Sequence, residues 1–201
     1  MRSVAGDREA GVFEYMLSLP VSLFAWFWGK MLGRFVVVFL QVLLAKFAAV
    51  AWGLGTDIEI PWAQVMYSTG FLLSLAWCVL GIGMLVSTLA RSSDVATGIA
   101  FIIWLGLLLF MDLILLGLLI RQGMPSETVI ALALFNPMQV FRTAAMMLFD
   151  PQLVLLGQSA YVILDNFGKM GYVLWALFYP VGLGTLCAWF GYAIFKRSDL
   201  P

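Results

Sequence analysis

The sequence predicts an all-α integral membrane protein with about four transmembrane helices, on the evidence of its composition, its long apolar runs and its uneven charge. Of its 201 residues, 63% are hydrophobic and only 11% are charged. A soluble globular chain has about 45–50% apolar and about 25% charged residues. Such an apolar excess cannot be buried in a small water-soluble domain, because too little polar surface remains to cover it. Membrane lipid must therefore be the main solvent.

Four stretches are long enough to cross a hydrocarbon core, which takes about 20 residues of α-helix. They are roughly Leu32–Leu54, Met66–Leu89, Ala96–Ile120 and Tyr172–Phe195. Lipid offers no hydrogen-bond partners to the backbone of an isolated strand, so all four are predicted to be helical. The alternation of apolar and polar residues that is typical of a membrane barrel is absent from them.

The basic residues orient these crossings. If the amino terminus is cytoplasmic, seven basic residues lie on the inner side, close to span ends: Arg2, Arg8, Lys30, Arg34, Arg91, Lys196 and Arg197. The outer segments then hold only Arg121, Arg142 and Lys169. Because inner loops carry the excess of Lys and Arg, both termini are predicted to be cytoplasmic.

Four regions follow from this topology. Residues 1–31 form a cytoplasmic interfacial segment, and residues 32–120 form three transmembrane helices. Residues 121–171 form an outer, periplasmic helical loop. Residues 172–201 form the last transmembrane helix and a cytoplasmic tail.

The first of these regions contains a short amphipathic stretch that ends at Pro20. Its apolar side chains share one helical arc: Val12, Phe13, Met16, Leu17 and Leu19. The stretch is too short to span a membrane, so we predict a helix at the cytoplasmic interface that is available to a soluble partner. A membrane-surface helix without a partner is the alternative.

The outer loop is broken at Asn136-Pro137 and at Asp150-Pro151, two dipeptides that favour turns. Between them, Met138–Phe149 is predicted to be an amphipathic helix that carries Arg142. We interpret the region as helices that lie on the outer leaflet or dip into it. The alternative is a broken or re-entrant span, which would change the topology after it.

Several classes of function are disfavoured. The chain has no His, which excludes Ser-His-Asp and Cys-His catalysis and most zinc sites. A net charge of zero argues against a nucleic-acid binder. No phosphate-binding loop is present, because Gly29-Lys30 lacks the earlier glycine and is followed by Met31. Cys78 and Cys187 lie in apolar runs and are interpreted as buried side chains. The eleven methionines make a poor metal site without His, so no metal site is expected. No catalytic residue is expected either. An intramembrane enzyme would have only acidic or Lys groups to work with.

Two charged residues lie away from the ends of predicted spans, where a charge is costly and functional roles are common. Asp112 is near the middle of Ala96–Ile120, and Lys46 is nearer the middle of its span than an end. Both are candidates for a transport pathway or for pairing between helices. The long stem of Lys46 also allows its ammonium to snorkel toward the interface.

Two closely spaced glycine pairs, Gly29-x-x-x-Gly33 and Gly81-x-Gly83, allow helices to approach each other closely. We interpret both pairs as packing features. A short glycine spacing does not identify the helix that packs there.

The cytoplasmic segment carries a recognisable motif. Residues 6–22, GDREAGVFEYMLSLPVS, are followed by Gly29-Lys30, and this pattern resembles the cytoplasmic signature of type 2 ABC transporter permeases. The resemblance implies a multi-pass protein of a bacterial or archaeal inner membrane, paired with a second copy of itself. It also implies that about Glu9–Leu19 form a coupling helix that docks on a separate cytoplasmic ATPase, which binds ATP and Mg²⁺. The implied coupling residues are Arg8, Glu9, Phe13, Glu14, Tyr15 and Leu17.

A second resemblance is narrower. Phe135–Arg142, FNPMQVFR, and the closing residues 195–200, FKRSDL, are similar to the NosY branch of this family. Its members are permeases of the system that matures nitrous oxide reductase, a copper enzyme of the periplasm. The similarity implies a periplasmic maturation protein as a further partner. A drug or lipid exporter permease and a non-transporting scaffold are the alternatives.

The chain departs from the family pattern at two points. Such permeases usually have six spans, with the coupling segment after the second, whereas here the segment lies almost at the start. Two amino-terminal spans are therefore expected to be missing from this sequence. Leu23 also stands where the family often has Arg.

Overall fold

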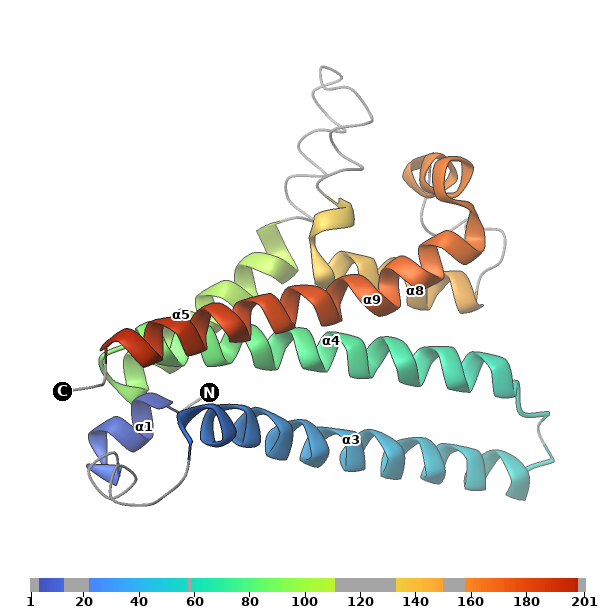
Figure 1. Ribbon diagram of the computed structural model, residues 1–201. Helices are drawn as coiled ribbons and strands as arrows, with labels where there is room; N and C mark the ends of the chain where they lie inside the picture. Colours follow the sequence, from blue (N-terminus) through green and yellow to red (C-terminus); the bar gives the residue numbers. More distant parts are fainter. Residues whose placement is uncertain (1–3, 13–21, 58, 111–132, 150–157, 199–201) are drawn as a thin grey trace. The chain divides into compact units, whose positions relative to one another are not determined.

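The computed structural model describes residues 4–12, 22–57, 59–110, 133–149 and 158–198 (Figure 1). Regular structure in these ranges is helical, without a strand. The elements are α1 (Val4–Glu9), α3 (Leu23–Gly55), α4 (Trp62–Leu89), α5 (Ser93–Leu105), the π-helix η1 (Gly106–Phe110), α8 (Pro137–Phe149) and α9 (Gln158–Ser198). The all-α prediction is confirmed.

Three described helices are long and apolar enough to cross a membrane: Leu23–Gly55, Trp62–Leu89 and Gly168–Arg197. They contain three of the four predicted spans. The first begins earlier than predicted, at Leu23, directly after a capping serine. The Ser22 Oγ accepts the backbone N–H of Ala25 at 3.2 Å. Residues 23–31, predicted to belong to the cytoplasmic segment, are therefore part of the same helix as the first predicted span. At about 1.5 Å per residue, α3 is about 50 Å long, more than a hydrocarbon core needs.

The remaining predicted span, Ala96–Ile120, is described only in its first part. Its helix α5 starts behind Ser92, whose Oγ accepts the backbone N–H of Val95 at 3.2 Å. It then passes into η1, which ends at Phe110. The apolar helical stretch Ser93–Leu109 is shorter than a complete crossing, and the rest of the predicted span lies outside the described residues.

The last helix, α9, is two helices joined at a kink. Gly168 has φ +65° and ψ 159°, a conformation that an L side chain rarely adopts. The membrane-crossing part starts at this glycine, a few residues before the predicted Tyr172. The kink therefore marks the start of the last candidate span.

The chain forms two compact units, and α3, α4 and α9 each contribute to both. Unit 1 comprises Met1–Val38, Ala76–Trp104 and Val181–Pro201. Its core is built from Val4, Phe27, Met31, Met84, Ala188 and Phe195. Unit 2 comprises Phe39–Leu75 and Leu105–Pro180. Its core is built from Phe71, Val140, Ala144, Met147, Tyr172 and Ala176.

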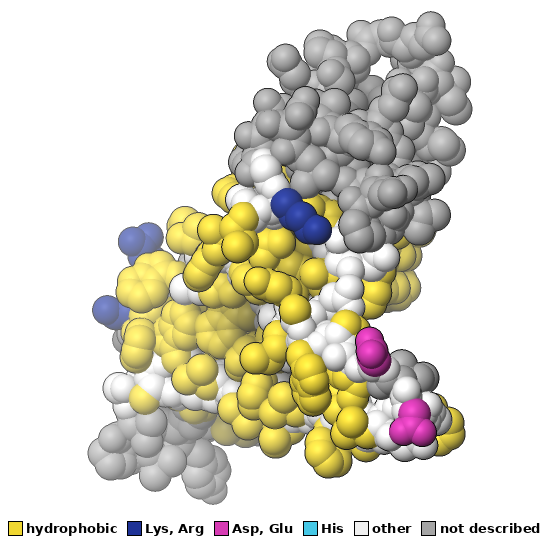
Figure 2. Space-filling model, turned by 90° about the vertical axis from the view of Figure 1, so that its right-hand side faces the viewer, with side chains coloured by type: hydrophobic (Ala, Val, Ile, Leu, Met, Phe, Trp, Pro, Cys, Tyr) yellow, Lys and Arg dark blue, Asp and Glu magenta, His cyan; other side chains and the backbone are white. Residues whose placement is uncertain are grey.

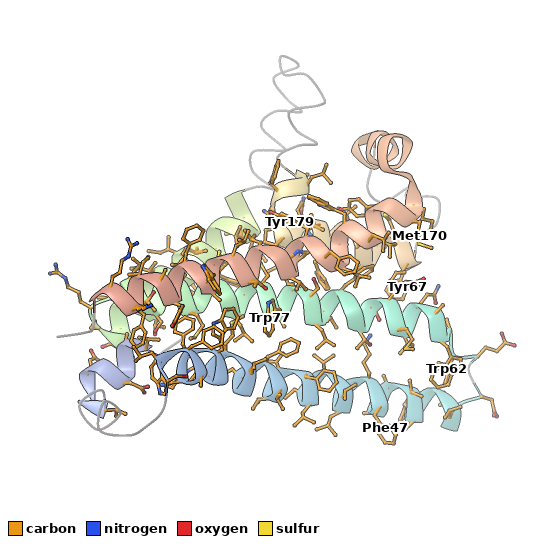
Figure 3. All side chains as sticks on the ribbon, viewed as in Figure 1. Phe47, Trp62, Tyr67, Trp77, Met170 and Tyr179 are labelled. Atoms are coloured by element: carbon orange, nitrogen blue, oxygen red, sulfur yellow. The ribbon has the colours of Figure 1, made fainter. Side chains whose placement is uncertain are left out.

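Much of the apolar side-chain surface stays exposed, as expected where lipid or other helices cover it. Figure 2 shows hydrophobic side chains over most of the described part of one face, with few charges among them. Along α3, Leu44 is 68% exposed and Phe47 is 73% exposed. Figure 3 shows Phe47 on the side of α3 that points away from α4. Water is a poor solvent for such a helix, which agrees with the composition.

Within unit 1, α4 and α9 touch through their backbones. A Cβ built on Gly81 would lie 2.0 Å from the carbonyl oxygen of Gly184, and one on Gly184 would lie 2.7 Å from the Cα of Cys78. Farther along, a Cβ on Gly191 would lie 3.1 Å from the Cα of Leu85. The predicted close approach at Gly81 is therefore confirmed.

The other glycine pair behaves differently. A Cβ on Gly29 or on Gly33 would meet no atom within 4 Å. Within the described part of the chain, the packing predicted for this pair is not found.

The glycine contact predicts an asymmetric response to alanine. Gly81→Ala should lower the free energy of unfolding by about 1–3 kcal/mol, because its methyl group must push two backbones apart. Gly182→Ala is the matched control: it lies on α9 with open space around it. The control should be neutral or stabilising by up to about 1 kcal/mol, through helix propensity. Thermal unfolding in detergent measures both, and equal effects would contradict the contact.

Candidate coupling site and intramembrane lysine

The short helix α1 is hydrogen-bonded to the end of α4. The backbone N–H groups of Val4 and Ala5 donate to the Oγ of Ser87, at 2.9 and 3.1 Å. All three residues are fully buried. The first turn of a helix has N–H groups without intrahelical partners, and here one serine hydroxyl satisfies two of them.

The same helix is paired with the start of α3. Asp7 forms a salt bridge with Lys30, and both side chains are about a quarter exposed. The Lys30 Nζ also lies over the ring of Trp26, 4.5 Å from its centroid. Trp26 in turn stacks on Phe195 of α9, with ring centroids 5.4 Å apart. One lysine thus links α1 to an aromatic contact between two spans.

Small residues complete the surroundings of α1. Ala5 packs with Ala90, which follows α4, and with Ala96 on α5. Helix α1 therefore contacts parts of α3, α4 and α5, all within unit 1. It ends at Glu9, and Gly11 then adopts φ +65°. Glu9 is exposed.

The sequence-predicted coupling residues begin in this helix. Arg8 and Glu9 are the last two residues of α1. Phe13, Glu14, Tyr15 and Leu17 lie outside the described residues, so their roles stay predictions. Sequence reasoning did not identify the residues that hold α1: Asp7, Lys30 and Ser87. Lys30 belongs to the Gly-Lys pair of the motif, which was a signal, whereas nothing in the sequence near Ser87 indicates its distant partners.

The intramembrane Lys46 has a partner on the neighbouring span. Its Nζ donates to the Oγ of Ser68 at 2.7 Å. Ser68 donates its own proton to the carbonyl oxygen of Val65 at 3.1 Å, which leaves a lone pair turned to the lysine. Both belong to unit 2. The other intramembrane candidate, Asp112, lies outside the described residues.

The Asn136-Pro137 break is a well-formed helix start. The Asn136 Oδ1 accepts the backbone N–H of Met138 at 2.9 Å, and Pro137 occupies the first helical position. The Asn136 Nδ2 donates to the carbonyl oxygen of Leu107 in η1 at 2.8 Å. The predicted helix Met138–Phe149 is confirmed as α8.

Side chains of neighbouring helices bond to other carbonyl groups around α8, all within unit 2. The Trp175 Nε1 donates to Leu134 O at 3.2 Å. Tyr179 donates to the carbonyl oxygen of Phe135 (Figure 3). The Gln64 Nε2 donates to Leu148 O at 3.0 Å, in the last turn of α8. These carbonyl groups have protein partners and do not depend on water, as a segment in contact with lipid requires.

Within the described ranges, no group of three or more His, Cys, Asp or Glu side chains could hold a metal ion. Cys78 and Cys187 are free thiols, the first of them buried. The burial predicted for Cys78 is confirmed.

Fold and site together define a multi-pass helical membrane protein with a short amino-terminal helix fixed to its spans. The chain belongs to the ABC-2 family: the family profile described as "ABC-2 family transporter protein" matches residues 1–200. It is 26% identical over 206 residues to the "Probable ABC transporter permease protein NosY" of Stutzerimonas stutzeri, which covers 97% of this chain and 71% of that protein. The resemblance in the motif is therefore confirmed, and the family implies an ATPase partner in a transporter complex.

The lysine–serine pair predicts stability changes of different size. Ser68→Ala should lower the free energy of unfolding by about 1–2 kcal/mol, because it leaves a partly buried ammonium without its acceptor. Lys46→Met should change it by less than about 0.5 kcal/mol or raise it, because the costly charge goes with the bond. The double variant should match Lys46→Met. Thermal unfolding in detergent checks the cycle, and additive losses would contradict a direct pairing.

Proposed function

We propose that this chain is the membrane-spanning permease subunit that couples ATP hydrolysis by a separate cytoplasmic ATPase to transport or mechanical work across the inner membrane. ATP and Mg²⁺ bind to the ATPase, and this chain supplies the coupling segment and the spans. The attachment of α1 to α3 and α4 carries the proposal. It fixes the spans to the residues that lead directly into the motif of the coupling helix.

The proposed mechanism is mechanical. A short helix that sits in a groove of the ATPase converts closure of the ATPase dimer into movement of the spans attached to it. Glu9 and Glu14 would pair with basic groove residues, and Phe13, Tyr15 and Leu17 would supply apolar contacts. A second copy of the chain would complete the permease, since such dimers are the form in which this family is expected to work.

The charge distribution supports cytoplasmic termini. Unit 1 contains seven basic and five acidic residues, whereas unit 2 contains four basic and six acidic residues. All seven basic residues of the predicted inner side belong to unit 1. Unit 1 includes α1, so the positive-inside rule supports a coupling segment on the side of the ATPase.

Similarity to NosY supports a more specific role, in which the work serves the copper-site maturation of nitrous oxide reductase through a periplasmic maturation protein. Export of a drug or lipid is the alternative. Lys46 has two candidate roles, in a substrate pathway or in pairing between helices. The Lys46–Ser68 bond between adjacent spans favours the pairing role.

The orientation predicts the labelling of single cysteines. In a background with Cys78 and Cys187 replaced by alanine, Glu59→Cys should react with a membrane-impermeant maleimide in intact cells, because it lies in the exposed α3–α4 connection. Arg91→Cys, in the exposed α4–α5 connection, should react only after the membrane is opened. The reverse pattern would invert the proposed topology.

The coupling segment itself is tested by substitution. Replacing residues 9–19 with a Gly/Ser linker of equal length should abolish co-purification of the ATPase and its stimulation by the permease, because the docking side chains are gone. Lys46→Met is the control, since Lys46 belongs to α3 and not to the coupling segment, and it should retain the ATPase. Thermal unfolding in detergent confirms that both variants are folded. Retention of a fully stimulated ATPase by the linker variant would refute the proposed function.

A further inference from the structure

We infer that Ser87 is a positioning residue for coupling: it fixes α1 to α4, so that a displacement of the coupling segment moves this span. This inference rests on the proposed function and adds the residues through which force passes. The Asp7–Lys30 pair is a second tether, which carries the same displacement to α3.

The attachment of α1 to Ser87 resists movement, because breaking it would leave buried backbone N–H groups without an acceptor. Its hydroxyl oxygen accepts two backbone N–H groups, and donors and acceptor are fully buried. If α1 slid relative to the end of α4, both donors would be left without a partner and without water. Such buried, unpaired groups are costly, so α1 and the end of α4 move together.

The two tethers act on different spans and at different points of α1. Ser87 holds the first two residues of the helix, whereas Lys30 holds Asp7, near its end. Attachment at two points resists rotation of α1 as well as translation. Helix α1 ends at Glu9, the first residue of the coupling segment, and Gly11 within that segment adopts a left-handed conformation. The fixed part of the chain thus ends where the docking part begins.

A serine of the same helix provides a matched control. Ser74 is also buried on α4, and its Oγ donates to the carbonyl oxygen of Leu177 at 2.6 Å. It belongs to unit 2 and has no bond to α1. Ser74→Ala and Ser87→Ala therefore remove the same atom from equally buried sites, and only the second releases α1.

The experiment uses the full chain in complex with its ATPase, in nanodiscs. Ser87→Ala should keep ATPase association, because residues 9–19 are intact, but lower the stimulation of ATP hydrolysis by about three- to thirtyfold. Hydrogen exchange at the amides of Val4 and Ala5 should become about tenfold faster or more. Ser74→Ala should leave stimulation and the exchange of these amides at wild-type values.

The partly exposed pair gives a second route if Ser87→Ala does not fold. Asp7→Asn and Lys30→Gln should each lower stimulation while retaining the ATPase. Suppose that the wild-type chain stimulates the ATPase, and that Ser87→Ala, or Asp7→Asn and Lys30→Gln, stimulate it as strongly as Ser74→Ala does. This result would overturn the inference and leave the proposed function standing. A wild-type chain that neither binds nor stimulates the ATPase would overturn both.

Discussion

The backbone contact between α4 and α9 at Gly81 and Gly184 determines much of the structure of unit 1. It is possible only because neither residue has a side chain. The approach brings the Trp77 Nε1 to the Oγ1 of Thr185 at 3.0 Å (Figure 3). It also buries Met84 and Ala188 in a core that α1 and the start of α3 complete. Close packing against α9 thereby restrains the end of α4, which carries the Ser87 hydroxyl that binds α1.

In unit 2, side-chain hydrogen bonds to backbone groups take the place of a backbone contact between helices. A chain that reverses direction in contact with lipid has backbone groups that its own helices cannot satisfy. Around α8 these groups are satisfied by the side chains of Asn136, Trp175, Tyr179 and Gln64. Aromatic donors suit this role because each combines one polar atom with a large apolar body.

Local features of this fold were predictable from the sequence, and long-range ones were not. The Asn136-Pro137 break and the helix after it follow from a capping residue and a fixed proline φ, both of which act within one turn. The bond from Val4 to Ser87 joins residues 83 positions apart and has no local signature. Gly81 and Gly29 illustrate the same limit. A glycine spacing shows that helices could approach closely, but only the tertiary structure shows that they do so at Gly81 and not at Gly29.

The direction of the helices has an electrostatic consequence. Trp77 contacts Thr185, and Leu85 approaches Gly191, so α4 and α9 run parallel and their carboxyl-terminal ends lie on the same side of unit 1. Their macrodipoles place two partial negative charges at these ends. Lys196 and Arg197 stand in the last turn of α9, and Arg91 lies two residues beyond the end of α4. These cations offset the aligned dipoles, so basic residues that predict the orientation in the membrane also lower the electrostatic cost of two parallel helices.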